Sequence, residues 1–316
     1  MDSNNYVDPN SHTPLQHLSW VERNGFSHWA VAGLWLIVAF LLFQIIAGIV
    51  AVALIFAVEG VPSAADAANI MLERLDLVFI GNTTGQILFL GLATLFVAKL
   101  HISTQSQSDF MRFKTGPDTG FYLGLSAALF VVVQPAIWYI GYLNSLLPLP
   151  DIFTEMQQSQ YQMIENFLRS DGVMIMALFH VGVVPAICEE VLFRGYVLRA
   201  FEKSWGIIAA IVVSGLLFGL YHMQLANLLP LATLGILLAI VTWLSNSIWP
   251  AVFAHFVNNG GAVVLGTYFP DVVFADISPE TAPPVWMLFL SLILTGVIIK
   301  LLYTRSRYKK VNHGFI

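Results

Sequence analysis

The chain has 316 residues, of which 57% are hydrophobic and only 10% are charged. Soluble globular domains carry about 25% charged residues, so this chain has too few charges to cover a surface that faces water. The composition therefore excludes a soluble enzyme and a disordered regulator. The net charge of −5 leaves no basic surface for nucleic acid, and the single cysteine excludes a disulfide framework or a cysteine-rich metal site. The solvent that fits this composition is the lipid bilayer.

A helix that crosses a bilayer needs about 20 mostly apolar residues, and eight stretches reach or approach that length. In chain order they are residues 29–58, 77–99, 121–146, 172–196, 205–223, 228–244, 249–269 and 285–303. The predicted fold class is all-α, a polytopic membrane helix bundle of about eight transmembrane helices. Residues 151–171, between the third and fourth stretches, have the spacing of an amphipathic helix that lies on the membrane surface.

These stretches divide the chain into four predicted parts. Residues 1–28 form a polar segment, and residues 29–171 contain the first three transmembrane helices with their loops. Residues 172–265 contain helices four to seven and form the predicted core. Residues 266–316 contain the last transmembrane helix and a basic tail.

The distribution of Lys and Arg predicts the orientation in the membrane, because basic residues gather in cytoplasmic segments. With the N-terminus inside, only Arg74 and Arg169 fall in outside segments. The other 12 basic residues fall in inside segments: Arg23, Lys99, Arg112, Lys114, Arg194, Arg199, Lys203, Lys300, Arg305, Arg307, Lys309 and Lys310. Arg194 is predicted to lie within the membrane and does not count, yet the split remains 11 to 2. Both termini are therefore predicted to be cytoplasmic.

Ionisable and amide side chains interrupt three of the apolar stretches, all in the second half of the chain. They are Glu189, Glu190 and Arg194 in the fourth stretch, His222 at the end of the fifth, and His255 and Asn259 in the seventh. Such groups are costly within a bilayer and are functional candidates by default.

Helical spacing assigns these residues different tasks. Glu190 and Arg194 are four residues apart and share a helix face, so they can form an ion pair. Glu189 points elsewhere and has no sequence-local cation. A carboxylate in an apolar setting has a raised proton affinity and can serve as a general base, with His222 orienting the water.

His255 and Asn259 also share one helix face. Two polar donors one turn apart can stabilise a developing oxyanion. The sequence thus offers a base, a water-orienting group and oxyanion donors on three helices.

Two other interpretations of the same residues remain open. The glutamates and Arg194 can form a buried ion-pair cluster that only fixes helix packing. Alternatively, Glu189, His222 and His255 can bind Zn²⁺ with one open position. The sequence has no His-Glu-x-x-His motif, so we expect no metal or other cofactor, with zinc as the alternative.

The ordered motifs resemble those of the CPBP family, which contains the CAAX-processing proteases and bacteriocin-processing proteins. They are Glu-Glu-x-x-x-Arg at 189–194, Phe-x-x-x-His from Phe218 to His222, and His-x-x-x-Asn at 255–259. The resemblance implies a multi-pass intramembrane endopeptidase, in a bacterial inner membrane, that cleaves a membrane-associated protein or peptide. It also implies that Glu189 and His222 activate water, that His255 and Asn259 bind the oxyanion, and that Glu190, Arg194 and Phe218 support them.

The competing functions are a proton-coupled transporter and a non-catalytic immunity or scaffold protein. The protease hypothesis requires one particular feature of the fold. Glu189 and His222 can meet only if the fourth helix continues past Arg194 towards Phe201, which would place Glu189 near mid-depth. The sequence does not predict the substrate, the cleaved bond or the oligomeric state.

Overall fold

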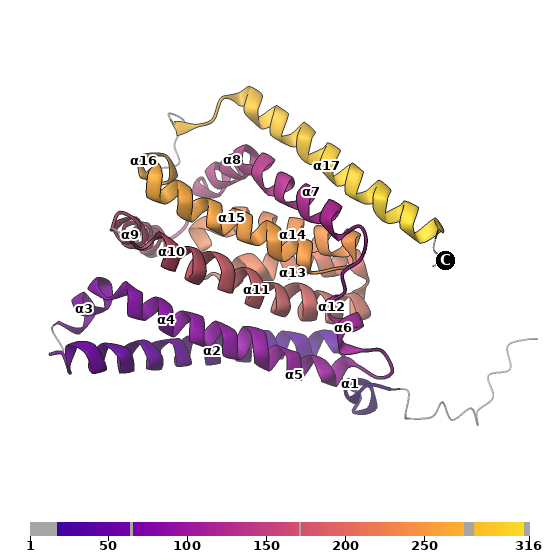
Figure 1. The fold of residues 1–316 in the computed structure, drawn as a ribbon, viewed down its shortest axis with the longest axis horizontal. Helices are drawn as coiled ribbons and strands as arrows, with labels where there is room; N and C mark the ends of the chain where they lie inside the picture. The colour runs from indigo at the N-terminus through magenta and orange to yellow at the C-terminus, as the bar shows by residue number, and fades with distance from the viewer. Residues whose placement is uncertain (1–17, 64–65, 171, 275–280, 313–316) are drawn as a thin grey trace, which may run out of the picture.

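The computed structural model describes residues 18–63, 66–170, 172–274 and 281–312 of the chain, and these ranges contain helices and connecting turns but no strand. The main helices lie side by side in a bundle (Figure 1). The predicted all-α class is thus confirmed. Most of the predicted polar segment 1–28 and the end of the basic tail, residues 313–316, lie outside the described residues.

The first half of the chain contains two long helices, His28–Glu59 and Leu75–His101, and several shorter ones. They are α1 (Trp20–Arg23), α2 (His28–Glu59), α3 (Ala67–Glu73), α4 (Leu75–Gly85), η2 (Gln86–Ala93), α5 (Thr94–Ala98), η3 (Lys99–His101), α6 (Gln107–Phe110), α7 (Thr119–Val132), α8 (Gln134–Ser145) and α9 (Asp151–Leu168). The segments α4, η2, α5 and η3 form one continuous helix that packs along α2. The helix predicted at 151–171 is present as α9.

The second half contains the helices that carry the polar motifs. They are α10 (Met174–Ala177), η4 (Leu178–Val183), α11 (Val184–Glu190), η5 (Val191–Val197), α12 (Leu198–Trp205), α13 (Ile207–Tyr221), η6 (Leu225–Asn227), α14 (Leu228–Ser245), α15 (Trp249–Tyr268), α16 (Pro270–Val273) and α17 (Val285–Asn312). The segments from α10 to α12 form one continuous helix.

Five helices are long and apolar enough to cross a membrane: His28–Glu59, Leu75–His101, Met174–Trp205, Leu225–Ser245 and Val285–Arg307. A sixth is added if α7 and α8, which meet at 46°, form one bent span. Pro135 at the start of α8 explains this bend, because proline has no N–H and its ring clashes with the preceding turn. The chain is therefore a multi-pass integral membrane protein.

Two of the eight predicted stretches do not meet that test. Helix α13 has 15 residues and measures about 22 Å at 1.5 Å per residue, which is shorter than the hydrocarbon core of a bilayer. Helix α15 has 20 residues, but its polar motif residues make it less apolar. Both exceptions are helices that bring polar groups into the bundle.

The helix predicted at 172–196 is longer than expected and continues to Trp205. Glu189 and Glu190 are the two central residues of this 32-residue helix. Helix α13 ends at Tyr221, so it brings His222 only part of the way along the bundle. The fourth helix thus continues past Arg194, as a contact between Glu189 and His222 requires.

The α13–α14 pair is in close backbone contact. A side chain at Gly215 would collide with the backbone of Ile236, and one at Gly219 would collide with the backbone of Ala232. Gly215 and Gly219 therefore allow these two helices to pack closely. The approach also presents the Gly235 carbonyl to Arg194.

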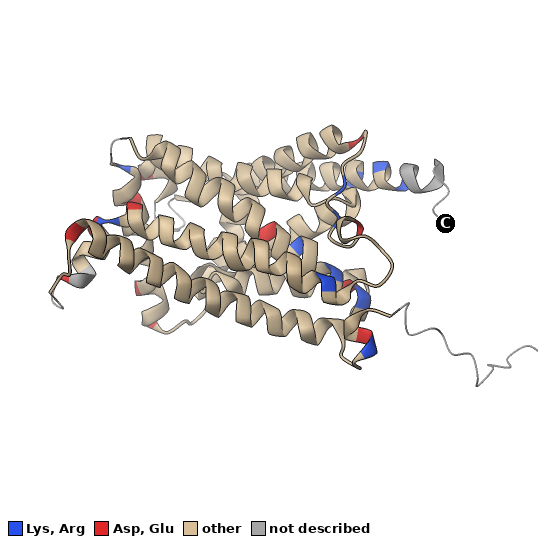
Figure 2. Ribbon diagram, turned by 60° about the horizontal axis from the view of Figure 1, so that its bottom comes forward, with Lys and Arg blue, Asp and Glu red and all other residues tan. Residues whose placement is uncertain are grey.

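Lys and Arg residues gather at one end of the bundle, where α1, α6 and α12 lie (Figures 1 and 2). Asp and Glu residues are more frequent at the opposite end, where α3 and α9 lie (Figures 1 and 2). The two ends therefore differ in charge along the direction of the helices.

Candidate active site

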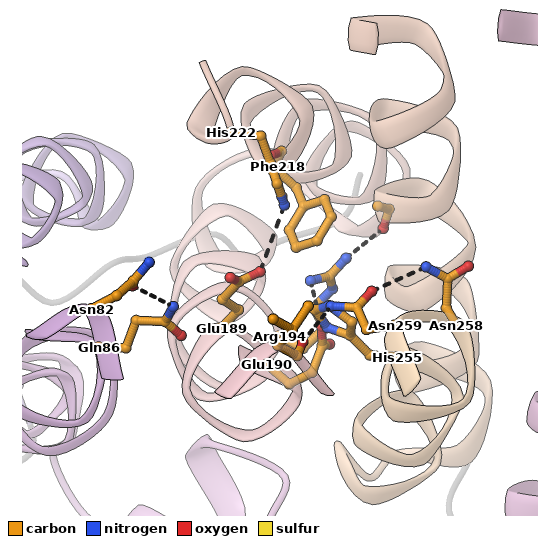
Figure 3. Close-up of polar contacts among 12 residues, drawn as sticks. Asn82, Gln86, Glu189, Glu190, Arg194, Phe218, His222, His255, Asn258 and Asn259 are labelled. Carbon is orange, nitrogen blue, oxygen red and sulfur yellow. Dashed lines mark hydrogen bonds and ion pairs between the residues drawn. The ribbon is translucent and has the colours of Figure 1, made fainter. Parts of the chain in front are cut away.

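The polar motif residues converge in the middle of the bundle (Figure 3). Glu189, Glu190 and Arg194 come from the long helix 174–205, His222 follows α13, and the remaining residues come from α15. The backbone widens into π-helical turns before and after α11. Such turns are frequent at functional sites because they redirect side chains relative to an ideal helix.

Glu190 is the centre of a buried ion-pair network. Its Oε1 lies 2.8 Å from Arg194 Nη1 and 2.9 Å from His255 Nδ1. Its side chain has no exposed surface, and that of Arg194 is 1% exposed. The predicted Glu190–Arg194 pair is present, and His255 joins it as a second partner that helical spacing did not indicate.

Arg194 is held on its other side by the α13–α14 pair. Its Nη2 donates to the Gly235 carbonyl at 2.9 Å. Its guanidinium carbon lies 4.4 Å from the ring centroid of Phe218, within the range of a cation–π contact. The Phe218 of the second motif therefore contacts the buried cation directly.

Asn259 connects α15 to the long helix. Its Nδ2 donates to the Val181 carbonyl at 3.1 Å and lies 3.2 Å from His255 Nε2. The residue four positions after Val181 is Pro185, which has no N–H to offer this carbonyl. The Asn259 amide thus donates to a carbonyl that lacks its usual intrahelical donor.

These contacts are consistent with one protonation pattern. With the proton of His255 on Nδ1, the ring donates to Glu190 and accepts at Nε2 from Asn259. The Asn259 Oδ1 accepts from Asn258 Nδ2 at 3.1 Å, and Asn258 Oδ1 accepts from Gln134 Nε2 at 3.1 Å. In this arrangement every hydrogen bond made by His255 and Asn259 joins a donor to an acceptor.

Glu189 lies on a different face of the long helix and meets His222. Its Oε2 is 4.0 Å from His222 Nε2. In the part of the chain that the structure describes, no Lys or Arg forms an ion pair with Glu189. The Glu189 side chain is 13% exposed and that of His222 is 27% exposed, so this pair is less buried than Glu190, whose side chain has no exposed surface.

The orientation of His222 is fixed by the backbone of α13. Its Nδ1 lies 2.8 Å from the Phe218 carbonyl, which can only accept. The proton is therefore on Nδ1, and Nε2 faces Glu189 as an acceptor in the neutral ring. The Glu189 Oε2 is buried and has no hydrogen-bond partner in the protein.

The ligands of the alternative zinc site are not brought together. His255 faces Glu190 rather than Glu189 and His222. Among the described residues, no three His, Cys, Asp or Glu side chains are placed to hold a metal ion. The structure therefore does not provide the three-ligand set of the zinc hypothesis.

Several groups around the site were not predicted from the sequence. The carbonyls of Gly235 and Val181 act as acceptors, and no side-chain motif marks them. Gln86 hydrogen-bonds Asn82 at 2.9 Å, and both lie on the side of Glu189 away from His255 (Figure 3). Two polar residues in an apolar stretch can be recognised in the sequence. Their location on the Glu189 side of the site cannot, because they are about 100 residues away from Glu189 in the chain.

Comparison with known proteins identifies the region that contains all of these motifs. Residues 171–261 match the family described as type II CAAX prenyl endopeptidase Rce1-like. This segment is an Rce1-like domain of the CPBP family. The resemblance predicted from the three motifs is thus confirmed.

The chain is also similar to a curated protein. The "Putative membrane peptidase YdiL" of Bacillus subtilis (strain 168) is 29% identical over 84 residues, which are 27% of this chain and 34% of that protein. The chain therefore spans about a third of the length of the curated relative that it matches. No solved structure matches the chain significantly.

Proposed function

We propose that the chain is an intramembrane endopeptidase that hydrolyses a peptide bond in a membrane-associated protein or peptide. The observation that carries this proposal is the Glu189–His222 pair, which contains a buried carboxylate oxygen without a partner. Glu189 lies at the centre of the long helix, and both residues lie within the segment that matches the family described as type II CAAX prenyl endopeptidase Rce1-like. No other ionisable pair of the motif network is open to water to the same extent.

The distance between the two side chains suits a bridging water. At 4.0 Å, Glu189 Oε2 and His222 Nε2 are too far apart for a direct hydrogen bond. A water at about 2.8 Å from each would donate one proton to each acceptor and direct a lone pair outwards. This is the arrangement that general-base catalysis requires.

The reaction then proceeds in two steps. The water oxygen attacks the carbonyl carbon of the substrate while Glu189 takes a proton from it, which gives a tetrahedral oxyanion. The C–N bond breaks as the proton moves to the leaving nitrogen, and the carboxylate of Glu189 is regenerated. His222 orients the water, because its Nδ1–H is held by the Phe218 carbonyl.

We assign oxyanion binding to His255 and Asn259, with one rearrangement. The amide protons of Asn259 are directed at Val181 and His255, so a substrate oxygen has to replace one of these acceptors. A His255 ring that carries a proton on both nitrogens would offer a further donor at Nε2 while Nδ1 stays on Glu190. Catalytic hydrogen bonds often reach their final geometry only when substrate is bound.

Proteomics of membranes can test this function and separate it from its alternatives. Three strains are compared: wild type, a deletion, and one that produces Glu189→Gln. An endopeptidase predicts that the same uncleaved protein accumulates in the deletion and in the variant. A scaffold or immunity protein predicts that the variant resembles wild type, and a transporter predicts no change in any cleaved terminus. Either of the last two results would contradict the proposal.

We further propose eight membrane crossings with both ends of the chain in the cytoplasm, including the short α13 and the polar α15. The gathering of basic residues at one end of the bundle supports this orientation (Figure 2). Cysteines introduced as Ser3→Cys and Asn312→Cys should react with a membrane-impermeant thiol reagent only after cells are opened. The native Cys188 is buried, so its background should be low. Labelling of either position in intact cells would overturn this topology.

Chelation is expected to leave peptide hydrolysis unchanged. The reason is that the proposed mechanism uses only protein side chains and water. The measurement is cleavage of a membrane-protein substrate by purified chain before and after treatment with a strong zinc chelator. Activity that is lost on chelation and restored by Zn²⁺ would replace the glutamate mechanism with a zinc mechanism.

A further inference from the structure

A cavity lies at the basic end of the bundle, apart from the polar motifs. Its volume is about 620 Å³, which is the size of a small-molecule site. It is lined by the starts of α7 and α15, the end of α14, the loop that precedes α7, and Glu202 of α12. None of the motif residues of the candidate active site lines it.

Two residues that line this cavity each carry a buried donor atom without a hydrogen-bond partner. Arg112 donates from Nε to Asn246 at 3.0 Å and from Nη2 to Glu202 at 3.0 Å, but its buried Nη1 has no acceptor. Tyr122 is 2% exposed, and its hydroxyl also has no partner. Burying a donor without an acceptor costs about 1–3 kcal/mol, so two such donors in one lining indicate that an acceptor belongs there.

The charges around the cavity favour an anion as that acceptor. Of the acidic residues in its lining, Glu202 pairs with Arg112 and Asp118 pairs with Arg305. Burial and nearby Arg199 lower the pKa of Arg112 to about 10, so it remains a cation at neutral pH. Lys114 adds a second, more exposed cation to the lining, where it pairs with Asp109.

The helix ends at the cavity add to this preference. Helices α7 and α15 both begin there. No side chain caps α7, whereas in α15 Ser247 Oγ accepts from the Trp249 amide at 3.4 Å and Pro250 has no N–H. Helix N-termini carry a partial positive charge and present free N–H groups to an anion. Because apolar helices begin and end at this level, the cavity lies at the depth of lipid headgroups.

We propose that this cavity binds a phosphate group, with Arg112 Nη1 and the Tyr122 hydroxyl as donors. A phosphate has several acceptor oxygens and can therefore accept from two donors on different segments. The group can belong to a phospholipid headgroup or to a soluble phosphate, and both sources present the same chemistry. This site does not depend on the proposed endopeptidase activity.

The test uses the purified full chain in an uncharged detergent at constant ionic strength. Three probes are titrated: inorganic phosphate, dihexanoylphosphatidylglycerol, and dihexanoylglycerol, which lacks the phosphate. The readouts are the thermal unfolding midpoint and tryptophan fluorescence, since Trp243 lines the cavity. We expect saturable binding of the lipid phosphate. Additional binding of inorganic phosphate would show that a soluble source is also accepted.

The decisive variant is Tyr122→Phe, which removes a hydroxyl that bonds to nothing in the protein and should therefore fold normally. A hydrogen bond to a charged group contributes about 1.5–3 kcal/mol, so the variant should bind the phosphate probe at least about tenfold more weakly. The matched control is Tyr221→Phe, which removes another buried hydroxyl without a partner, outside this cavity. Equal affinity of wild type and Tyr122→Phe, or equal binding of dihexanoylglycerol, would overturn the proposal.

Discussion

The variant Glu189→Gln is expected to lose peptide hydrolysis by at least about 10³-fold, because the amide cannot accept the proton of the attacking water. Glutamine has the same shape as glutamate, and the lost oxygen has no partner in the protein, so folded yield should not change. The measurement is the rate of cleavage by purified chain in detergent, together with the thermal unfolding midpoint. A matched control is Glu155→Gln on the exposed face of α9.

The contrast with Asn259→Ala tests the division of tasks within the site. Loss of one oxyanion donor typically lowers a rate by about 10²–10³, so this variant should be slow but measurable. It also removes the donor to the Val181 carbonyl and should lower stability slightly. If Glu189→Gln retained a rate near wild type, Glu189 could not be the base and the proposed mechanism would be wrong.

Local patterns in the sequence were sufficient for the parts of the site that lie within one helix. The all-α class follows from the apolar stretches, and the Glu190–Arg194 pair follows from their spacing of four residues. The opposite phase of Glu189 correctly separates it from that pair. These features depend only on helix geometry, which the sequence determines directly.

Features that depend on how helices meet were not predictable in the same way. The sequence predicted that His255 binds the oxyanion, and it did not predict a contact with Glu190. In the structure, His255 Nδ1 faces Glu190 because of how α15 packs against the long helix. The number of long apolar helices was also overestimated. Polar motif residues and short length make α13 and α15 atypical spans, and a count of apolar residues does not separate them from ordinary ones.

Pro185 shows how a local signal gains meaning only in three dimensions. The sequence indicates that proline disturbs the long helix near Glu189. It does not indicate that the Val181 carbonyl then accepts from Asn259, 78 residues away in the chain. The third motif thus has a structural contact with the first helix of the domain as well as its proposed catalytic role.

The variant Arg194→Met is expected to destabilise the protein strongly while removing no group that contacts the proposed water. Methionine fills much of the space beside Phe218, but it leaves Glu190 as a buried carboxylate without its cation. Breaking a buried ion pair from one side costs about 3–5 kcal/mol. The measurement is the yield of monodisperse protein and its thermal unfolding midpoint.

The double variant Glu190→Gln, Arg194→Met decides whether the loss comes from the uncompensated charge. Glutamine is neutral and its Oε1 can still accept from His255, so the double variant should recover part of the lost stability. The matched control is Arg169→Met, because the Arg169 side chain is 47% exposed in its pairs with Glu165 and Asp271 and exposed pairs contribute about 1 kcal/mol or less. If Arg194→Met gave the yield and midpoint of wild type, the network around Glu190 would not be a stabilising element. The ion pair would then have to be retained for the reaction itself, with Arg194 setting the charge that Glu190 presents to His255.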